Sequence, residues 1–173
     1  LLLFGFITYK LLRPKRTTEQ IFNFETAFTQ YINRDQIDFC NSDKYKNTIL
    51  ADYYISSSYN PISIGYLKYD YVSTNMIEKT IIYGNRYIEL EILDKEIHNN
   101  TIPVIGIGNE EGYITNSQNV LSCEEVFKTI SEVAFSQRYV NNYRDPLFIF
   151  LNLKTQNIST LNKLNNIIIK YLN

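Results

Sequence analysis

The sequence has no tryptophan and contains only one methionine, one histidine and two cysteines. The cysteines, Cys40 and Cys123, lie far apart and form no metal-binding motif. We therefore expect two reduced, buried thiols, with one long-range disulfide as the alternative. Neither charge is in excess, since 17 basic residues balance 18 acidic ones. This balance excludes the broad basic field with which proteins attract nucleic acid, so no nucleic-acid partner is expected.

What the sequence does contain is enough apolar material for a core. Its 173 residues are 45% hydrophobic, which suits one packed domain better than two. Isoleucine, asparagine and lysine are frequent. Such a bias is typical of A/T-rich genomes, including those of some giant viruses and protists. A viral origin is therefore one interpretation of the composition.

The N-terminal segment is apolar and ends in a basic cluster. Residues 1–12 are mostly apolar, and Arg13, Lys15 and Arg16 follow. Twelve residues cannot span a bilayer, which takes about 20, but a basic flank is typical of a membrane helix at its cytoplasmic end. We expect 1–16 to be a truncated membrane anchor, which would place the rest on the cytoplasmic or virion-interior side. An ordinary amphipathic or core helix is the alternative.

The remaining sequence predicts a helix and then alternating strands and helices. Residues 17–45 read as a helix, capped by Thr17 or Thr18, and a connector. The alternation that follows predicts a parallel α/β fold. Its near-continuous apolar stretch at 146–153 indicates a strand buried on both faces. The expected strands are 53–55, 87–93, 103–107 and 146–153, and the expected helices are 72–83, 122–135 and 157–172.

Four segments carry motifs in one fixed order: YYISSSYN at 53–60, GNRYIELE at 84–91, PVIGIG at 103–108 and PLFIFLN at 146–152. They resemble FISSSHNTY, GCRCVELD, PVIYHG and PVILSLE of the X region of phosphoinositide-specific phospholipase C. The resemblance covers about 46–172. It implies that 46–173 forms the first half of a TIM-type (β/α) barrel, preceded by an N-terminal helix. Further sequence or a protein partner would complete the barrel.

The resemblance also implies a chemistry that this chain lacks. The family uses two histidines as acid and base in phosphodiester cleavage, because imidazole titrates near neutrality. Tyr59 and Ile107 occupy those two positions. A phenol with a pKa near about 10 is a poor base at neutral pH, and isoleucine transfers no proton. No catalytic residue is intact. The single histidine, His98, is expected at a solvated hairpin tip.

A weakened calcium site and phosphate contacts are further implications of the resemblance. Asn60, Glu89, Glu91 and Asn152 match the metal positions, with two carboxylates and two amides. Fewer charges mean a lower calcium affinity, so no cofactor or a weakly bound calcium is expected. The alternative is that Glu89 and Glu91 pair with Arg86 or water. The residues expected to contact a substrate phosphate are Ser58, Asn60 and Arg86, and Arg86 has a structural role as its alternative.

Three hypotheses about function follow. The first is a membrane-tethered, catalytically inactive relative of phospholipase C with a binding or structural role, for example as a virion component that holds a phosphoinositide headgroup. The second is a divergent active phosphoric diester hydrolase that acts on phosphoinositides. The third is a plain α/β domain with accidental motif matches.

Overall fold

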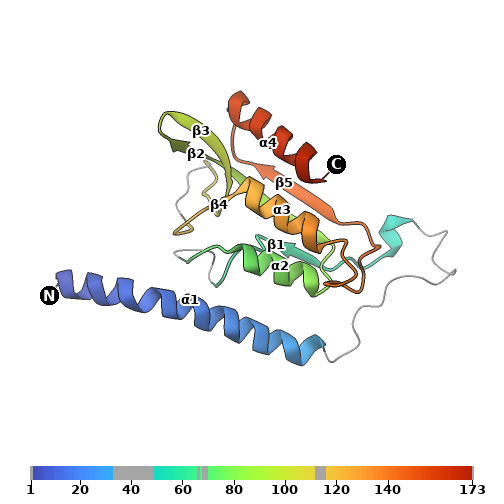
Figure 1. Cartoon of the computed structure of the whole chain (residues 1–173), viewed down its shortest axis with the longest axis horizontal. Helices are drawn as coiled ribbons and strands as arrows, with labels where there is room; N and C mark the ends of the chain where they lie inside the picture. Colours follow the sequence, from blue (N-terminus) through green and yellow to red (C-terminus); the bar gives the residue numbers. More distant parts are fainter. Residues whose placement is uncertain (1, 33–48, 66, 68–69, 112–115, 173) are drawn as a thin grey trace. The chain divides into compact units, whose positions relative to one another are not determined.

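A computed structural model of the chain describes residues 2–32, 49–65, 67, 70–111 and 116–172 (Figure 1). The chain divides into two compact units, Leu1–Arg34 and Asp35–Asn173. The predicted connector up to residue 45 and Cys40 lie outside the described residues.

The first unit contains one helix, α1, from Leu2 to Ile32. The helix passes without a break through the expected boundary at 16–17, so the prediction that a second helix begins at Thr17 or Thr18 is wrong. The apolar side chains of Leu3, Phe4 and Phe6 are exposed. Within the described segments we find no helix whose length and apolarity would suffice for a bilayer crossing.

The second unit is built on a five-stranded sheet. Its strands are β1 (Ser57–Tyr59), β2 (Tyr87–Ile97), β3 (Asn100–Ile105), β4 (Leu121–Ser122) and β5 (Phe148–Leu153). The first half of β2 pairs in parallel with β1 on one side and with β5 on the other. The predicted strand at 53–55 is wrong in position, since β1 is formed by the serine–tyrosine run that follows it.

The second half of β2 has a different partner. It pairs with β3 in an antiparallel hairpin, and β3 also pairs antiparallel with β4. The expectation of a parallel strand at 103–107 is therefore wrong. The reason is local, because His98 and Asn99 both have positive φ (49° and 60°) and reverse the chain in two residues. A parallel neighbour would need a long crossover, for which no residues are left.

Three helices, α2 (Thr74–Ile82), α3 (Cys123–Val133) and α4 (Ile158–Leu172), pack on one side of this sheet (Figure 1). Each lies close to the predicted helix. The Ser73 hydroxyl caps α2 by accepting from the Asn75 N–H at 3.2 Å. Gly84, with φ at 94°, follows the end of α2, a conformation that favours glycine. Asn157 caps α4 by accepting from the Ser159 N–H at 2.9 Å. A short 3-10 helix, η2 (Leu50–Asp52), precedes β1.

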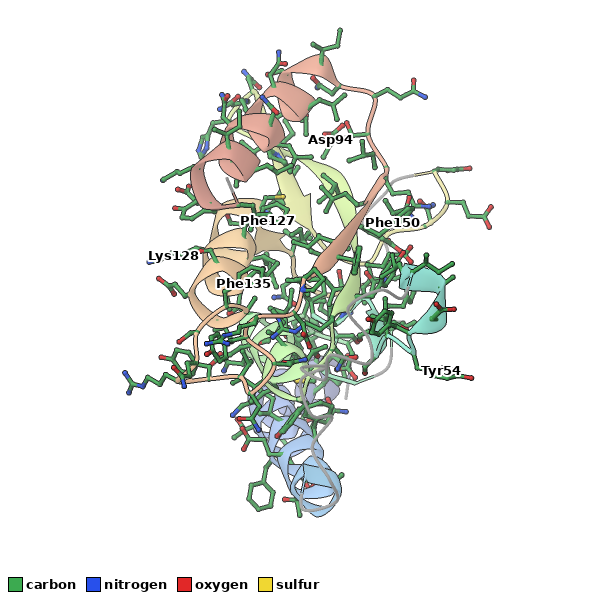
Figure 2. The ribbon with its side chains drawn as sticks, turned by 90° about the vertical axis from the view of Figure 1, so that its right-hand side faces the viewer. Tyr54, Asp94, Phe127, Lys128, Phe135 and Phe150 are labelled. Carbon is green, nitrogen blue, oxygen red and sulfur yellow. The ribbon has the colours of Figure 1, made fainter. Side chains whose placement is uncertain are left out.

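The two faces of the sheet differ in burial. Ile88, Leu90 and Ile92 point to the helices and are fully buried. On the opposite face, Tyr59 and Phe150 are about half exposed, at 52% and 49%. Figure 2 shows Phe150 on the side of β5 away from α3 and α4. The prediction that 146–153 is buried on both faces is therefore wrong, since α2, α3 and α4 all pack on the other face and no residue of β5 is fully buried.

Candidate functional site

Glu91 lies at the centre of a buried hydrogen-bond cluster on the open face of the sheet. Its side chain is only 3% exposed. Glu91 Oε1 accepts from the Tyr59 hydroxyl at 2.6 Å and from Asn60 Nδ2 at 3.2 Å, and Oε2 accepts from the Gly108 N–H at 3.0 Å. A buried carboxylate needs such donors, because desolvation without them is costly. We call these four residues the Glu91 cluster.

Asn60 contributes the second polar group of the cluster. It directly follows β1 and has φ at 46°, a left-handed conformation that asparagine tolerates better than most residues. Its N–H donates to the Glu89 carbonyl at 3.0 Å, so its position is fixed by the sheet. The side chain is 2% exposed, and its Oδ1 has no hydrogen-bond donor among the described residues. A buried acceptor of this kind requires an explanation.

Tyr59, which the sequence resemblance aligns with the first histidine, acts here as a hydrogen-bond donor. The hydrogen bond to Glu91, partial burial and the charges of Glu91 and Glu89 together raise the pKa of Tyr59 to about 12. The phenol therefore stays protonated at neutral pH, and its proton points to a carboxylate of the protein. It cannot serve as a general base in this arrangement.

Ile107, which the sequence resemblance aligns with the second histidine, belongs to the hydrophobic core. It is 4% exposed and packs in the main core cluster. Its N–H donates to Ser117 Oγ at 3.2 Å, which fixes the backbone just before the Gly108 N–H that reaches Glu91. The backbone at 107–108 therefore supports Glu91, and the Ile107 side chain itself has no proton to give to a leaving group.

The register of the sheet places the other two expected metal ligands near Glu91. Glu89 pairs with Tyr59 on β1 and Phe150 on β5, and Glu91 pairs with Asn152. Residues two apart on a strand share a face, so Glu89, Glu91 and Asn152 lie on the same side of the sheet. Both Glu89 and Asn152 are partly buried.

The oxygen atoms at the expected metal positions can be compared with what a calcium ion requires. Calcium takes about 6–8 oxygen ligands and prefers several carboxylates. Glu91 Oε1 already accepts two hydrogen bonds and Oε2 accepts one, so the buried carboxylate is satisfied by the protein. Among the described residues, no group of three or more acidic, histidine or cysteine side chains is arranged to hold a metal. The residues as placed do not fit calcium, although the unpaired Asn60 Oδ1 is an oxygen of the right kind.

Two of the residues expected to contact phosphate lie elsewhere. Ser58 pairs with Ile88, so strand alternation puts it on the helix side of the sheet. Arg86 is 5% exposed, and its guanidinium donates to the Ala134 carbonyl at 2.8 Å and to both oxygens of Asn142. Neither joins the Glu91 cluster, and Arg86 does not pair with Glu89 or Glu91. Of the expected contacts, only Asn60 belongs to the cluster.

His98 lies at the turn of the β2–β3 hairpin and is exposed, as predicted. It follows Glu91 by seven residues, or about 23 Å along a strand, so it is out of reach of the cluster. Two features of the site were not predicted. One is the Gly108 N–H, which no side-chain pattern signals. The other is Asn142, whose pairing with Arg86 depends on the loop between α3 and β5.

Comparison with known proteins identifies the class of fold. No protein-family model matches the chain, and no curated protein matches its sequence. The crystal structure of S. officinalis PLC21 matches with a TM-score of 0.56 and 20% identity, over 72% of this chain and 14% of that one. The crystal structure of L. pealei PLC21 matches with a TM-score of 0.55 at the same identity and coverage.

The chain therefore has a phospholipase C-like α/β fold. At 20% identity the likeness shows the fold alone, and the chain spans only 14% of the length of either PLC21 structure. The third hypothesis, of accidental motif matches on an unrelated α/β fold, does not agree with this result. Activity must be argued from the Glu91 cluster itself.

Proposed function

We propose that this chain is a membrane-tethered module resembling the phospholipase C X region, without catalytic activity and with a binding or structural role. The observation that carries the proposal is the 2.6 Å hydrogen bond from the Tyr59 hydroxyl to Glu91. It commits the residue at the first histidine position to a contact within the protein. The buried Ile107 at the second position supports the same conclusion.

The expected loss of activity is large. A positioned acid or base typically contributes about 10²–10⁴-fold to the rate. Without either, phosphodiester cleavage loses the proton transfer both to and from the reacting oxygens. Binding of a phosphoinositide headgroup on the open face would not need those transfers, because it relies on hydrogen bonds and charge. A binding role is therefore compatible with the same residues.

We propose further that the second unit is the first half of a barrel, and this rests on the open edges and the open face of the sheet. Among the described strands, β1 and β5 each pair only with β2. Unpaired edges of parallel strands are normally covered or continued, and Tyr59 and Phe150 on this face are half exposed. Further sequence or a protein partner would close the barrel over this face.

The tether part of the proposal rests on α1. Its first turns carry exposed apolar side chains at Leu3, Phe4 and Phe6, and the basic residues Arg13, Lys15 and Arg16 follow. Such a helix suits a membrane surface or the end of an anchor. A giant-virus membrane or virion is one setting that agrees with the composition. Sedimentation with vesicles of phosphatidylcholine, with and without phosphatidylinositol bisphosphate, tests both the tether and the headgroup.

The experiment that tests the loss of catalysis is hydrolysis of phosphatidylinositol and its bisphosphate by the full-length protein, with calcium and with chelator. We expect no turnover while an authentic phospholipase C is active in the same assay. Calcium-dependent turnover that disappears in Glu89→Ala would overturn the proposal, because it would show that one of the expected metal ligands supports catalysis.

A divergent active phosphodiesterase is the second candidate. The unpaired, buried Asn60 Oδ1 favours it, since a free acceptor beside a carboxylate suits a ligand or a cation. This candidate needs its acid and base from residues outside the cluster. The same hydrolysis assay separates the two candidates.

A further inference from the structure

The Glu91 cluster contains one hydrogen bond of a kind that excludes a metal ion. The Tyr59 hydroxyl donates to Glu91 Oε1 at 2.6 Å, a distance typical of a strong, charge-assisted O–H···O⁻ bond. We infer that the Tyr59 hydroxyl takes the place of a metal ion at this site. Glu91 then has a structural role, in which it joins Tyr59, Asn60 and Gly108 through hydrogen bonds. Removing the Tyr59 hydroxyl opens a divalent-cation site between Glu91 Oε1 and Asn60 Oδ1.

The first step is the count of donors on Glu91. A carboxylate oxygen has two lone pairs, and those of Oε1 are used by the Tyr59 hydroxyl and by Asn60 Nδ2 at 3.2 Å. Oε2 accepts from the Gly108 N–H. A cation approaching Oε1 must therefore displace the phenol from its strongest hydrogen bond. The folded chain satisfies its buried carboxylate with no cation at all.

The second step concerns the acceptor that the protein leaves unpaired. The Asn60 side chain is turned so that Nδ2 reaches Glu91, and Oδ1 is buried without a donor among the described residues. Turning the amide over would bring Oδ1 against the carboxylate, so the orientation is fixed by Glu91. In the cluster, Asn60 Oδ1 is therefore suited to a cation, whereas Glu91 Oε1 is blocked by its two hydrogen-bond donors.

The third step is what remains when the hydroxyl is removed. In Tyr59→Phe the ring keeps its place, while Glu91 Oε1 loses its closest donor. Glu91 and Asn60 then offer a carboxylate and an amide oxygen, and Glu89 lies two residues away on the same face. Calcium accepts both kinds of oxygen, and water completes its shell.

This inference deepens the proposed function, because it rests on Asn60 and Glu91 standing at the metal positions of the X region. Its test does not use hydrolysis. Calcium binding by calorimetry and the midpoint of thermal unfolding are measured on the full chain, with calcium and with chelator. Hydrolysis by the wild-type protein would overturn the proposed function and leave these two measurements interpretable.

We expect the wild-type protein to show no saturable calcium binding and the same unfolding midpoint in both conditions. Tyr59→Phe should show saturable calcium binding and unfold at a higher temperature in calcium than in chelator. Adding Glu91→Gln to that variant should abolish the gain. Tyr54→Phe, at a fully exposed tyrosine, is the matched control and should behave as the wild type.

Two results would overturn the inference. One is calcium binding by the wild-type protein that Glu91→Gln abolishes, and the other is a folded Tyr59→Phe protein that binds no calcium. The single variant Glu91→Gln provides a test that does not depend on Tyr59→Phe. It should lower the unfolding midpoint by the same amount in calcium and in chelator, and a loss confined to calcium would make Glu91 a metal ligand.

Discussion

Arg86 and Asn142 form a buried pair in which one guanidinium nitrogen serves both oxygens of the asparagine. Arg86 Nη2 donates to the Asn142 backbone carbonyl and to its Oδ1, the latter at 2.7 Å. Asn142 Nδ2 in turn donates to the Gly84 carbonyl at 3.2 Å. The pair therefore fixes the loop between α3 and β5 to the turn that precedes β2.

The first prediction is that Arg86→Lys destabilises the second unit by about 2–4 kcal/mol. Lysine keeps the charge but cannot serve the Ala134 carbonyl and both Asn142 oxygens at once. At least one buried acceptor then loses its donor. Urea unfolding followed by circular dichroism measures the change.

Arg138→Lys is the control for this prediction. Arg138 is exposed and lies over the Tyr139 ring at 5.6 Å, so we expect a change within about 0.5 kcal/mol. An equal loss in the two variants would show that Arg86 has no special structural role.

The second prediction concerns the close approach of the chain at Gly106, just before Ile107. A Cβ at Gly106 would lie 2.9 Å from Val120 Cγ1 and 3.3 Å from Leu93 Cδ1. Gly106→Ala should therefore cost about 1–3 kcal/mol by overpacking, measured on the same urea transition. Gly5→Ala, where nothing lies within 4 Å, should leave that transition unchanged. A neutral Gly106→Ala would contradict the packing described for this segment.

Much of the fold could be predicted from local pattern. The start of β2 at Tyr87, the end of α2 shortly before Gly84 and the two later helices follow from alternation, helical spacing and a turn signal. These signals depend only on neighbouring residues. The direction of β3 could not be predicted, because it is decided by a two-residue turn of non-glycine residues, His98 and Asn99, within a polar stretch. The residues of the hairpin near this turn are exposed and show no apolar alternation, so the sequence pattern predicts a loop there.

The site could be predicted only as far as motif positions go. The resemblance groups Asn60 with Glu91, and the structure also places them in contact, because Asn60 follows the end of β1, which pairs in parallel with the part of β2 just before Glu91. It could not show that Tyr59 donates to Glu91 or that Gly108 supports it. Those contacts join segments 17 and 32 residues apart in sequence. They depend on tertiary distances that no local pattern encodes.

The third prediction is that Lys163 holds the turn of the β2–β3 hairpin. Its amine donates to Asn100 Oδ1 at 2.5 Å and to the Thr101 carbonyl at 2.6 Å. Lys163→Met should increase hydrogen exchange of the hairpin amides next to the turn severalfold, with a stability loss of at most about 1 kcal/mol. Lys95→Met, on the exposed side of the same hairpin, is the control. Unchanged exchange in Lys163→Met would show that α4 does not hold the turn.

The fourth prediction concerns Cys123, which begins α3 and is fully buried. Burial raises the pKa of its thiol from 9.0 to about 12. In a Cys40→Ser background, where Cys123 is the only thiol, native protein should react with a thiol reagent only as fast as it unfolds. The measurement is the rate of labelling against urea concentration. Rapid labelling without denaturant would contradict the burial of this side chain.

The same thiol predicts a pH dependence of stability with a definite sign. Above pH 9 the unfolded chain releases a proton that the folded chain keeps until about pH 12, so the folded state binds more protons. The stabilising effect is complete below pH 9 and is lost as the pH rises, by at most roughly 1.4 kcal/mol per pH unit. Many tyrosines titrate in the same range, so the informative quantity is the difference between the wild-type protein and Cys123→Ala. We expect their free energies of unfolding to converge from about pH 9 to about pH 11, whereas a constant difference would mean that the folded thiol ionises as readily as the unfolded one.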